Sequence, residues 1–512
     1  MDAYGIISIA FLAAYLFIGL YAGRKTHSVE DHFVMSRSAP AFFIMGTLIA
    51  SNLSSVTFTG FTATVITSGP LAMITQFGAT ITAMLFIGLY AGRYLYRMKL
   101  LTIPDFFAKR YPGKYASLAA SLIVLISMTA YMITVTLGSV VVISNIFGWS
   151  LHLSLLAIMS IITVFTVVGG MRSVVVTDTA MFVVFLIAAL VIGPSVVVKT
   201  GGLKEAIGKA TESLPYLFRW HGNATPFLGF MAILEMNVLS WLLNLGAPHL
   251  ISRVNIAKSE RELGKSMIYL AVVLPILIIA LLYPFSFFPL LGTDVKPVES
   301  YVWVCKNLVP TLFGAIGLAG VVAAAISTAT SLFQQASATL SSCIIKDFFF
   351  PNMDDKRLLL VSRISVVVIG VIVYFGSLNP SISGATIMYA FLFATAAFGA
   401  WIPAIYMGLL WRRATTAGAT WSMFTAMPLI IFVSIGRQKG FLPSWIPTNL
   451  VGVTFAFVVM YVVSLLTKED AGNKVYDEIH AFDAELKKKP KPSVGLGGEV
   501  AVQPAKMDAA KS

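Results

Sequence analysis

Long runs of apolar residues, separated by short polar stretches, follow one another from residue 5 to residue 466. Each run is long enough for a helix that crosses a lipid bilayer, which takes about 20 apolar residues. Ten-residue segments of alternating hydrophobicity, typical of an outer-membrane barrel, are absent. The pattern predicts an all-α polytopic membrane protein with about thirteen transmembrane helices. The predicted spans lie near residues 5–22, 42–68, 71–92, 117–146, 151–169, 174–198, 226–247, 267–290, 310–340, 358–376, 384–410, 416–435 and 447–466.

The composition supports this interpretation. Of the 512 residues, 57% are hydrophobic and only 12% are charged, whereas soluble domains carry roughly 25% charged residues. Cys305 and Cys343 lie in different segments, without a CxxC motif or a histidine-rich cluster. We therefore expect neither a disulfide framework nor a structural zinc site. The net charge of +13 is attributed to cytoplasmic loops that face anionic lipid, and no nucleic-acid partner is expected.

The distribution of basic residues predicts the orientation of the chain. No basic segment precedes the first apolar run, and Arg24 and Lys25 follow it, which favours an uncleaved span over a signal peptide. With the N-terminus outside and the C-terminus inside, roughly 28 basic residues lie in the cytoplasm and about 8 lie outside. Residues 1–466 are expected to form the transporter domain. Residues 467–512, which include a Lys- and Pro-rich run at 487–492, are expected to form a disordered cytoplasmic tail.

Two polar stretches interrupt otherwise apolar spans. The first, residues 50–55, reads Ala-Ser-Asn-Leu-Ser-Ser. Asn and Ser are poor helix formers, so we expect the helix to break there. Non-helical backbone at membrane depth is tolerated only where it is buried or lines a cavity, and its free carbonyl oxygens suit a dehydrated sodium ion. The alternative is a continuous helix whose small residues pack against neighbouring helices.

The second polar stretch, residues 323–331, places hydroxyl groups on one face of a helix. Ala324, Ser327, Thr328 and Ser331 stand at positions i, i+3, i+4 and i+7. These hydroxyls offer oxygen ligands to a hard cation, or they bond only to carbonyls of their own helix. Both stretches lie near the middle of their spans, so they can face each other.

Asp178 and Glu235 are the two acidic residues within the predicted spans, and we expect no Lys or Arg well inside a span. An ionisable residue at membrane depth indicates a functional site by default, although Asp178 lies close enough to the end of its span to reach the interface. Glu235 lies about 15 Å into its span, near the midplane. It is followed in the same span by a polar stripe that contains Asn237, Trp241 and Asn244. It has three possible roles: contact with a cationic substrate group, proton transfer, or a bond to a neighbouring helix.

A series of short motifs resembles the sodium/solute symporter family over nearly all of residues 5–466. In chain order they are Gly23-Arg24-Lys25 with Ser28-Val29-Glu30-Asp31-His32-Phe33; Ala50-Ser51-Asn52-Leu53-Ser54; Thr102-Ile103-Pro104-Asp105-Phe106 with Lys109-Arg110-Tyr111; Gly169-Gly170-Met171-Arg172-Ser173 with Thr177-Asp178; Gly246-Ala247-Pro248-His249 with Arg253; and Ala324-Ala325-Ile326-Ser327-Thr328. Each motif is weak alone, but their order and spacing are specific. The resemblance implies the leucine-transporter fold, with two inverted five-helix repeats around a central site.

The resemblance also implies where sodium binds. Matching positions supply carbonyl oxygens and hydroxyl oxygens for one site, at Ala50, Leu53, Ala324, Ser327 and Thr328. A second sodium site, or an exit path for the first ion, is implied at Asp178, Ser327, Thr330 and Ser331. All of these ligands are oxygen atoms, which suit a hard cation. No organic cofactor is expected.

The residues expected to contact the solute come from three helices: Asn52, Ser54, Thr57, Gln76, Glu235, Asn237, Trp241 and Asn244. Some family members, such as proline carriers, have an aspartate at the position of Asn52, which weakens a specific assignment to proline. The Gly-x-Pro-His-x-x-x-Arg motif resembles carriers of proline, pantothenate and acetate more than carriers of sugars. With no arginine expected in the site, a carboxylate would be held by helix N-terminal N–H groups and hydroxyls, although Glu235 argues against a bare anion.

We therefore predict a sodium-coupled symporter in the plasma membrane, and a prokaryotic inner membrane fits best. It would import a small carboxylate-bearing solute, such as an amino acid, a pantothenate-like compound or a monocarboxylate, by alternating access. The alternatives are a sugar or sialic-acid symporter of the same family, and a solute sensor that acts with a separate partner. An enzyme is not expected, because the histidines lie in loops or at span ends and no catalytic set converges. The expected partners are the solute and membrane lipid, and the oligomeric state is left open.

Overall fold

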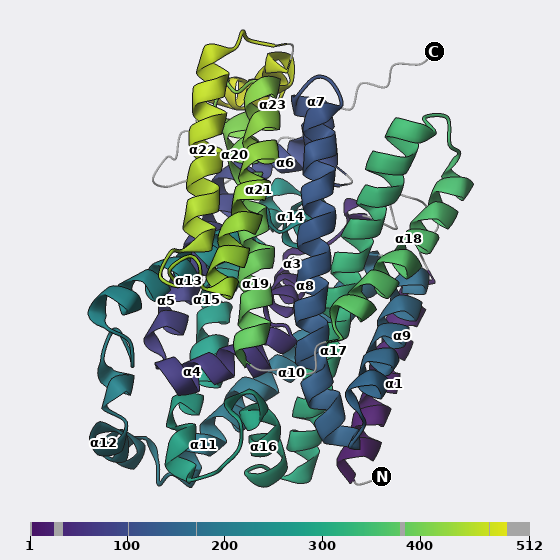
Figure 1. Ribbon diagram of the computed structural model, residues 1–512. Helices are drawn as coiled ribbons and strands as arrows, with labels where there is room; N and C mark the ends of the chain where they lie inside the picture. Colours follow the sequence, from purple (N-terminus) through teal and green to yellow (C-terminus); the bar gives the residue numbers. More distant parts are fainter. Residues whose placement is uncertain are drawn as a thin grey trace, which may run out of the picture.

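The computed structural model describes residues 3–24, 34–100, 102–169, 171–378, 384–470 and 472–488. Within these ranges the chain forms helices and no strand, apart from one isolated parallel bridge between Ala39 and Ala257 (Figure 1). Lys25, the motif at residues 28–33, Gly170 and the tail after residue 488 lie outside the described residues. In chain order the elements are α1 (Ala3–Gly23), η1 (Met35–Arg37), α3 (Ala41–Asn52), η2 (Thr57–Phe61), α4 (Thr62–Ser68), α5 (Leu71–Phe86), η3 (Ile87–Ala91), α6 (Gly92–Arg97), α7 (Pro104–Arg110), α8 (Tyr115–Phe147), α9 (Leu151–Gly169), α10 (Met171–Ile187), η4 (Ala188–Ile192), α11 (Gly193–Lys199), α12 (Leu203–Ser213), η5 (Pro215–Phe218), α13 (Pro226–Gly246), α14 (Pro248–Asn255), α15 (Glu260–Leu282), η6 (Tyr283–Leu291), η7 (Pro297–Glu299), α16 (Ser300–Asn307), α17 (Thr311–Ala338), η8 (Thr339–Phe349), α18 (Asp355–Gly376), α19 (Gly384–Gly399), α20 (Ile402–Leu410), α21 (Thr416–Lys439), α22 (Thr448–Leu466) and α23 (Asn473–Lys488).

The predicted spans coincide with helices in the structure. Within the described residues, eleven helices are long and apolar enough to cross a membrane. A bent pair, α3 with η2 and α4, forms a twelfth candidate, and residues 151–167 of α9 form a shorter apolar helix. Each predicted span therefore has a helical counterpart, while the total of thirteen crossings stays a prediction.

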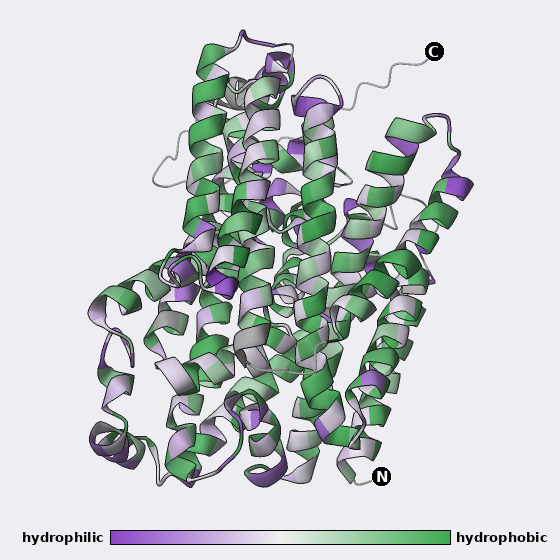
Figure 2. Cartoon of the chain, viewed as in Figure 1, coloured by the Kyte–Doolittle hydropathy of each residue, from purple (hydrophilic) through white to green (hydrophobic). Residues whose placement is uncertain are grey.

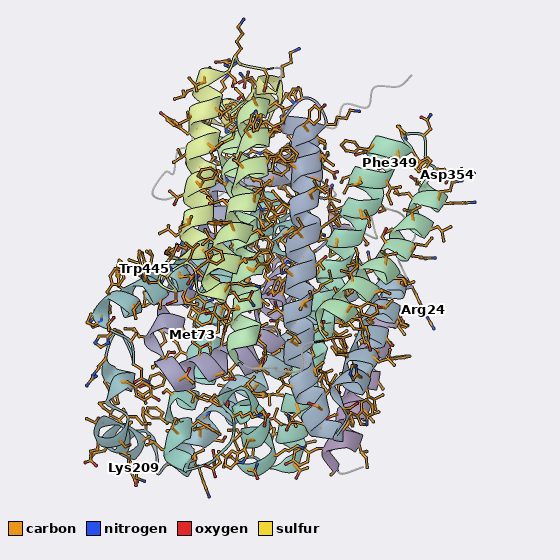
Figure 3. All side chains as sticks on the ribbon, viewed as in Figure 1. Arg24, Met73, Lys209, Phe349, Asp354 and Trp445 are labelled. Atoms are coloured by element: carbon orange, nitrogen blue, oxygen red, sulfur yellow. The ribbon has the colours of Figure 1, made fainter. Side chains whose placement is uncertain are left out.

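The first and the last described helices lie at opposite ends of the bundle, as an odd number of crossings requires. Hydrophobic residues dominate the middle of the helices, and polar residues gather at their ends (Figure 2). The start of α1 lies at the lower end of the view and α23 at the upper end (Figure 1). Lys209 of α12 lies at the lower end, while Phe349 and Asp354 lie at the upper end (Figure 3). The segments that contain these residues are predicted to lie on opposite sides of the membrane. The assignment of the upper end to the cytoplasm stays a prediction.

Helix α17 forms the centre of the bundle and is the most buried of the candidate spans. It contacts α1, α8, α9, α10, α16 and α18 along its length and also touches α3. Helix α3 packs closely on α10 because Gly46 has no side chain: a Cβ there would lie 2.9 Å from Thr179 Oγ1 and 3.1 Å from its Cα. Helices α3 and α17, which carry the two polar stretches, thus contact each other and α10.

The predicted tail contains a helix, contrary to the expectation of disorder from residue 467. Helix α23 contacts α6 and α7. The His480 ring stacks on Tyr94 of α6 at 4.2 Å between centroids, and Arg97 Nη1 donates to Ile479 O at 3.0 Å. Arg412, between α20 and α21, binds Asp477 through two hydrogen bonds of 3.0 and 3.1 Å and holds the pKa of Asp477 below its usual range. The composition of the tail could not reveal these contacts with distant loops.

Candidate sodium and solute sites

The predicted helix break is present at Leu53 and Ser54. Helix α3 ends at Asn52, the chain is helical again from Ser55, and the π-helical segment η2 begins at Thr57, with a bend of 54° between the two halves. Leu53 leaves helical geometry, with φ −96° and ψ 89°. The N–H of Leu53 still bonds back to Ile49 O at 2.9 Å. The two residues of the break therefore interrupt the regular helix among buried residues.

The residues expected to bind sodium lie buried on the two facing helices. Ala50 and Leu53 of α3 and Ala324 of α17 are buried. Within the described part of the chain, the buried Thr328 Oγ1 has no hydrogen-bond partner. Thr330 Oγ1, in contrast, bonds to Ile326 O of its own helix at 2.7 Å. Of these two threonines, only Thr328 has a buried hydroxyl without a hydrogen-bond partner among the described residues. Hydroxyl and carbonyl oxygens are ligands that a hard cation accepts.

Four of the residues expected to contact the solute line one cavity beside the break. The free space is about 10 Å³, about enough for one water molecule. Gln76 Oε1 and Ser240 Oγ, both in its lining, are buried atoms without a hydrogen-bond partner in the described chain. The lining residues are Asn52, Ser54, Val56, Thr57, Phe61, Gln76, Phe77, Thr80, Tyr131, Ser240, Leu243 and Phe391.

The aromatic part of this lining was not predicted from the sequence. Tyr131 comes from the long helix α8 and Phe391 from α19, and their rings pack together at 5.3 Å between centroids. Neither residue stands in a polar stretch, so no local signal distinguishes it from the many other apolar positions. Thr80 also lines the cavity and was not predicted. It lies one turn beyond Gln76 on α5, so helical spacing could have identified it.

Three other residues of the predicted solute set lie outside the cavity lining. Asn237 Nδ2 donates to Thr75 Oγ1 at 3.2 Å, and Asn244 Nδ2 donates to Thr80 Oγ1 at 3.4 Å, so both tie α13 to α5. Trp241 is 39% exposed. The polar stripe on α13 thus joins two helices and contributes Ser240 to the cavity.

Glu235 is held in an ion pair, which corrects the expectation that no basic residue lies near it. Arg437 Nη1 lies 2.6 Å from Glu235 Oε1, and Arg437 Nη2 lies 3.1 Å from Oε2. The N–H of Thr448 also donates to Glu235 Oε1 at 3.0 Å. Helix α21 continues four residues past the predicted span end at 435, to Lys439, and thereby carries Arg437 to this position. These contacts match one of the three roles considered for Glu235, namely a bond to a neighbouring helix.

Asp178 also has a basic partner, Arg253, where none was expected. Their side chains are both completely buried, with 3.5 Å between Arg253 Nη2 and Asp178 Oδ2. The hydroxyls of Thr47 and Ser327 donate to the same carboxylate. Arg253 was placed in a loop after the seventh predicted span, but this segment forms the buried helix α14. Arg253 therefore supplies the positive charge beside Asp178 that a second sodium ion would otherwise supply.

Comparisons with known proteins agree with this architecture. A family model described as the sodium:solute symporter family matches residues 32–426. The osmoregulated proline transporter OpuE of Bacillus subtilis is 27% identical over 91% of this chain and 95% of its own length. The sodium/pantothenate symporter of Haemophilus influenzae is 25% identical over 89% of this chain and 94% of its own length.

Solved structures show the same fold. A substrate-bound, outward-open Na+-coupled sialic acid symporter aligns with a TM-score of 0.76 at 16% identity, over 92% of this chain and 99% of its own. MhsT in complex with L-phenylalanine aligns with a TM-score of 0.52 at 14% identity, over 84% and 98%. The chain has the leucine-transporter fold expected from its motifs and is a multi-pass protein of the plasma membrane. Because the family model covers well over half of its length, the chain belongs to the sodium:solute symporter family.

Proposed function

We propose that this chain imports a small carboxylate-bearing solute by alternating access, driven by a sodium ion bound between α3 and α17. The ligands would be the carbonyls of Ala50, Leu53 and Ala324 and the hydroxyls of Ser327 and Thr328. The observation that carries the proposal is the buried Thr328 hydroxyl, unpartnered in the described chain, on a helix that contacts α3. Leaving a buried hydroxyl unpaired costs about 1–3 kcal/mol, and a bound cation would remove that cost.

The cavity lining supports a solute with one polar end and an apolar body. Amide and hydroxyl groups of Asn52, Ser54 and Gln76 lie opposite aromatic rings, and no charged residue lines the cavity. Because Arg437 neutralises Glu235 outside the lining, the objection to an anionic group is removed. A carboxylate would be held by hydroxyl and amide groups of the lining, because the N–H groups of Val56 and Thr57 already bond to Ser54. The relatives named for proline and pantothenate carry solutes with such a group, which supports this class.

Ion and solute would be coupled through the break itself. The segment that supplies Ala50 and Leu53 to the ion also supplies Asn52 and Ser54 to the cavity. A sodium ion that fixes the backbone of this segment would also fix the polar groups that face the solute. Such coupling is reciprocal, so the solute must raise sodium affinity by the same factor.

The test is uptake of radiolabelled solutes into proteoliposomes, with and without an inward sodium gradient. The panel contains amino acids, monocarboxylates and pantothenate, with sialic acid and a neutral sugar for the alternative hypothesis. Thr328→Ala should raise the sodium concentration for half-maximal uptake about tenfold, while the matched control Thr330→Ala, whose hydroxyl bonds to its own helix, should leave it unchanged. Sodium-independent uptake of every transported solute would refute the proposal, and binding without uptake would favour a sensor.

A further inference from the structure

A closed network of polar side chains surrounds the buried ion pair of Asp178 and Arg253. The carboxylate accepts hydrogen bonds from the hydroxyls of Thr47 and Ser327. The guanidinium donates to Thr47 Oγ1 at 3.0 Å and to Ser331 Oγ at 2.7 Å. Every one of these side chains is buried, with 1% exposure or less. The network therefore ties α3, α10, α14 and α17 together at a single point.

This network lies one helical turn from the proposed sodium ligands on both helices. Thr47 precedes Ala50 by three residues on α3, and Ser331 follows Thr328 by three residues on α17. Under the predicted orientation, both displacements point toward the cytoplasm. Ser327 belongs to both groups: its O–H donates to Asp178, which leaves the oxygen lone pairs for a cation on the other side.

The charges in this network balance without a further ion. A buried carboxylate is costly unless a cation lies beside it, and the Arg253 guanidinium supplies that cation. A sodium ion in the same place would add a second positive charge at low dielectric, where repulsion is strong. The other hydroxyls are engaged as well, because Ser331 accepts from Arg253 and Thr330 bonds to Ile326 O.

We infer that Arg253 is a tethered counter-cation that takes the place of a second sodium ion, so that this protein binds one Na+ rather than two. The inference rests on the proposed sodium site between α3 and α17 and adds its stoichiometry. It also gives Asp178 a positioning role, in which the carboxylate directs the Ser327 oxygen toward the single bound ion.

The test counts sodium ions and needs no solute. Equilibrium binding of ²²Na+ to the purified full-length protein should saturate at one ion in the wild type. Arg253→Met leaves Asp178 without its cation, so the count should rise to two at saturating sodium and high pH, where Na+ competes best with a proton for the carboxylate. The double variant Asp178→Asn with Arg253→Met removes both charges and should return the count to one.

Each outcome has a distinct meaning. Two ions in the wild type, or one ion in a folded Arg253→Met variant, would overturn the inference. If Arg253→Met does not fold, Asp178→Asn decides: one ion supports the role of Arg253, whereas loss of one of two ions shows a resident second sodium. No bound sodium in the wild type would refute the proposed function itself, which keeps the two failures apart.

Discussion

Replacing Glu235 by Gln should weaken the fold without changing solute recognition. The Glu235 carboxylate accepts three hydrogen bonds, two of them from Arg437, and the two side chains are only 8% and 10% exposed. A Gln side chain keeps Oε1 as the acceptor for Thr448 N–H and Arg437 Nη1 but presents a donor group to Arg437 Nη2. Loss of the Nη2 bond and of the carboxylate charge, with a buried cation left uncompensated, corresponds to about 3–5 kcal/mol of unfolding free energy.

The assay is a double-mutant cycle with Glu235→Gln, Arg437→Met and the double variant, read as thermal unfolding of the purified protein. Because the double variant leaves no unpaired buried charge, we expect it to be more stable than Glu235→Gln alone. In proteoliposomes, the apparent solute affinity of each folded variant should stay within about twofold of the wild type. A tenfold loss of solute affinity with unchanged stability would refute this reasoning and return Glu235 to the solute site.

Other substitutions test the remaining contacts. Gln76→Ala and Thr57→Ala should lower apparent solute affinity in uptake assays, with a smaller effect on sodium dependence at saturating solute, since both residues line the cavity; unchanged solute affinity in both would exclude them. The solute should raise the sodium affinity of the wild type in ²²Na+ binding and should do so less in Thr328→Ala, because coupling needs the ion site; an equal increase would contradict this. Asp477→Asn should speed amide hydrogen exchange in α23 at pH 7, because its carboxylate binds Arg412. Since the pKa of Asp477 is lowered in the folded protein, this contact contributes above the ordinary aspartate pKa of about 3.9 and is lost as the pH falls through the lowered value. Variant and wild type should exchange alike below that pH, and equal exchange at pH 7 would contradict the prediction.

Features encoded locally were predicted from the sequence. Apolar runs set the positions of the helices because burial in lipid depends on residue type alone. The break at Leu53 and Ser54 was predicted because Asn and Ser disfavour helix within their own turn. The grouping of Asn52, Ser54, Thr57 and Gln76 around one cavity followed from the family resemblance and is present in the structure.

Features that depend on distant contacts were not predicted. Arg253 lies 75 residues from Asp178, and Arg437 lies 202 residues from Glu235. Each arginine stands just beyond a predicted span, where sequence alone suggests exposure to water. Tertiary packing instead buries α14 and leaves the Arg437 side chain only 10% exposed. Both acidic residues looked like unpaired charges in the membrane for this reason.

The small size of the cavity affects how solute affinity should be understood. A space of about 10 Å³ cannot hold an amino acid, so the lining must move apart before a solute fits. If the widened form makes up one tenth of the population, the measured dissociation constant is about ten times the intrinsic one. Substitutions far from the cavity that favour the widened form would then tighten binding without touching the solute. Tyr131 and Phe391 both line this space, and their rings are in contact. We expect the widened form to separate these two rings.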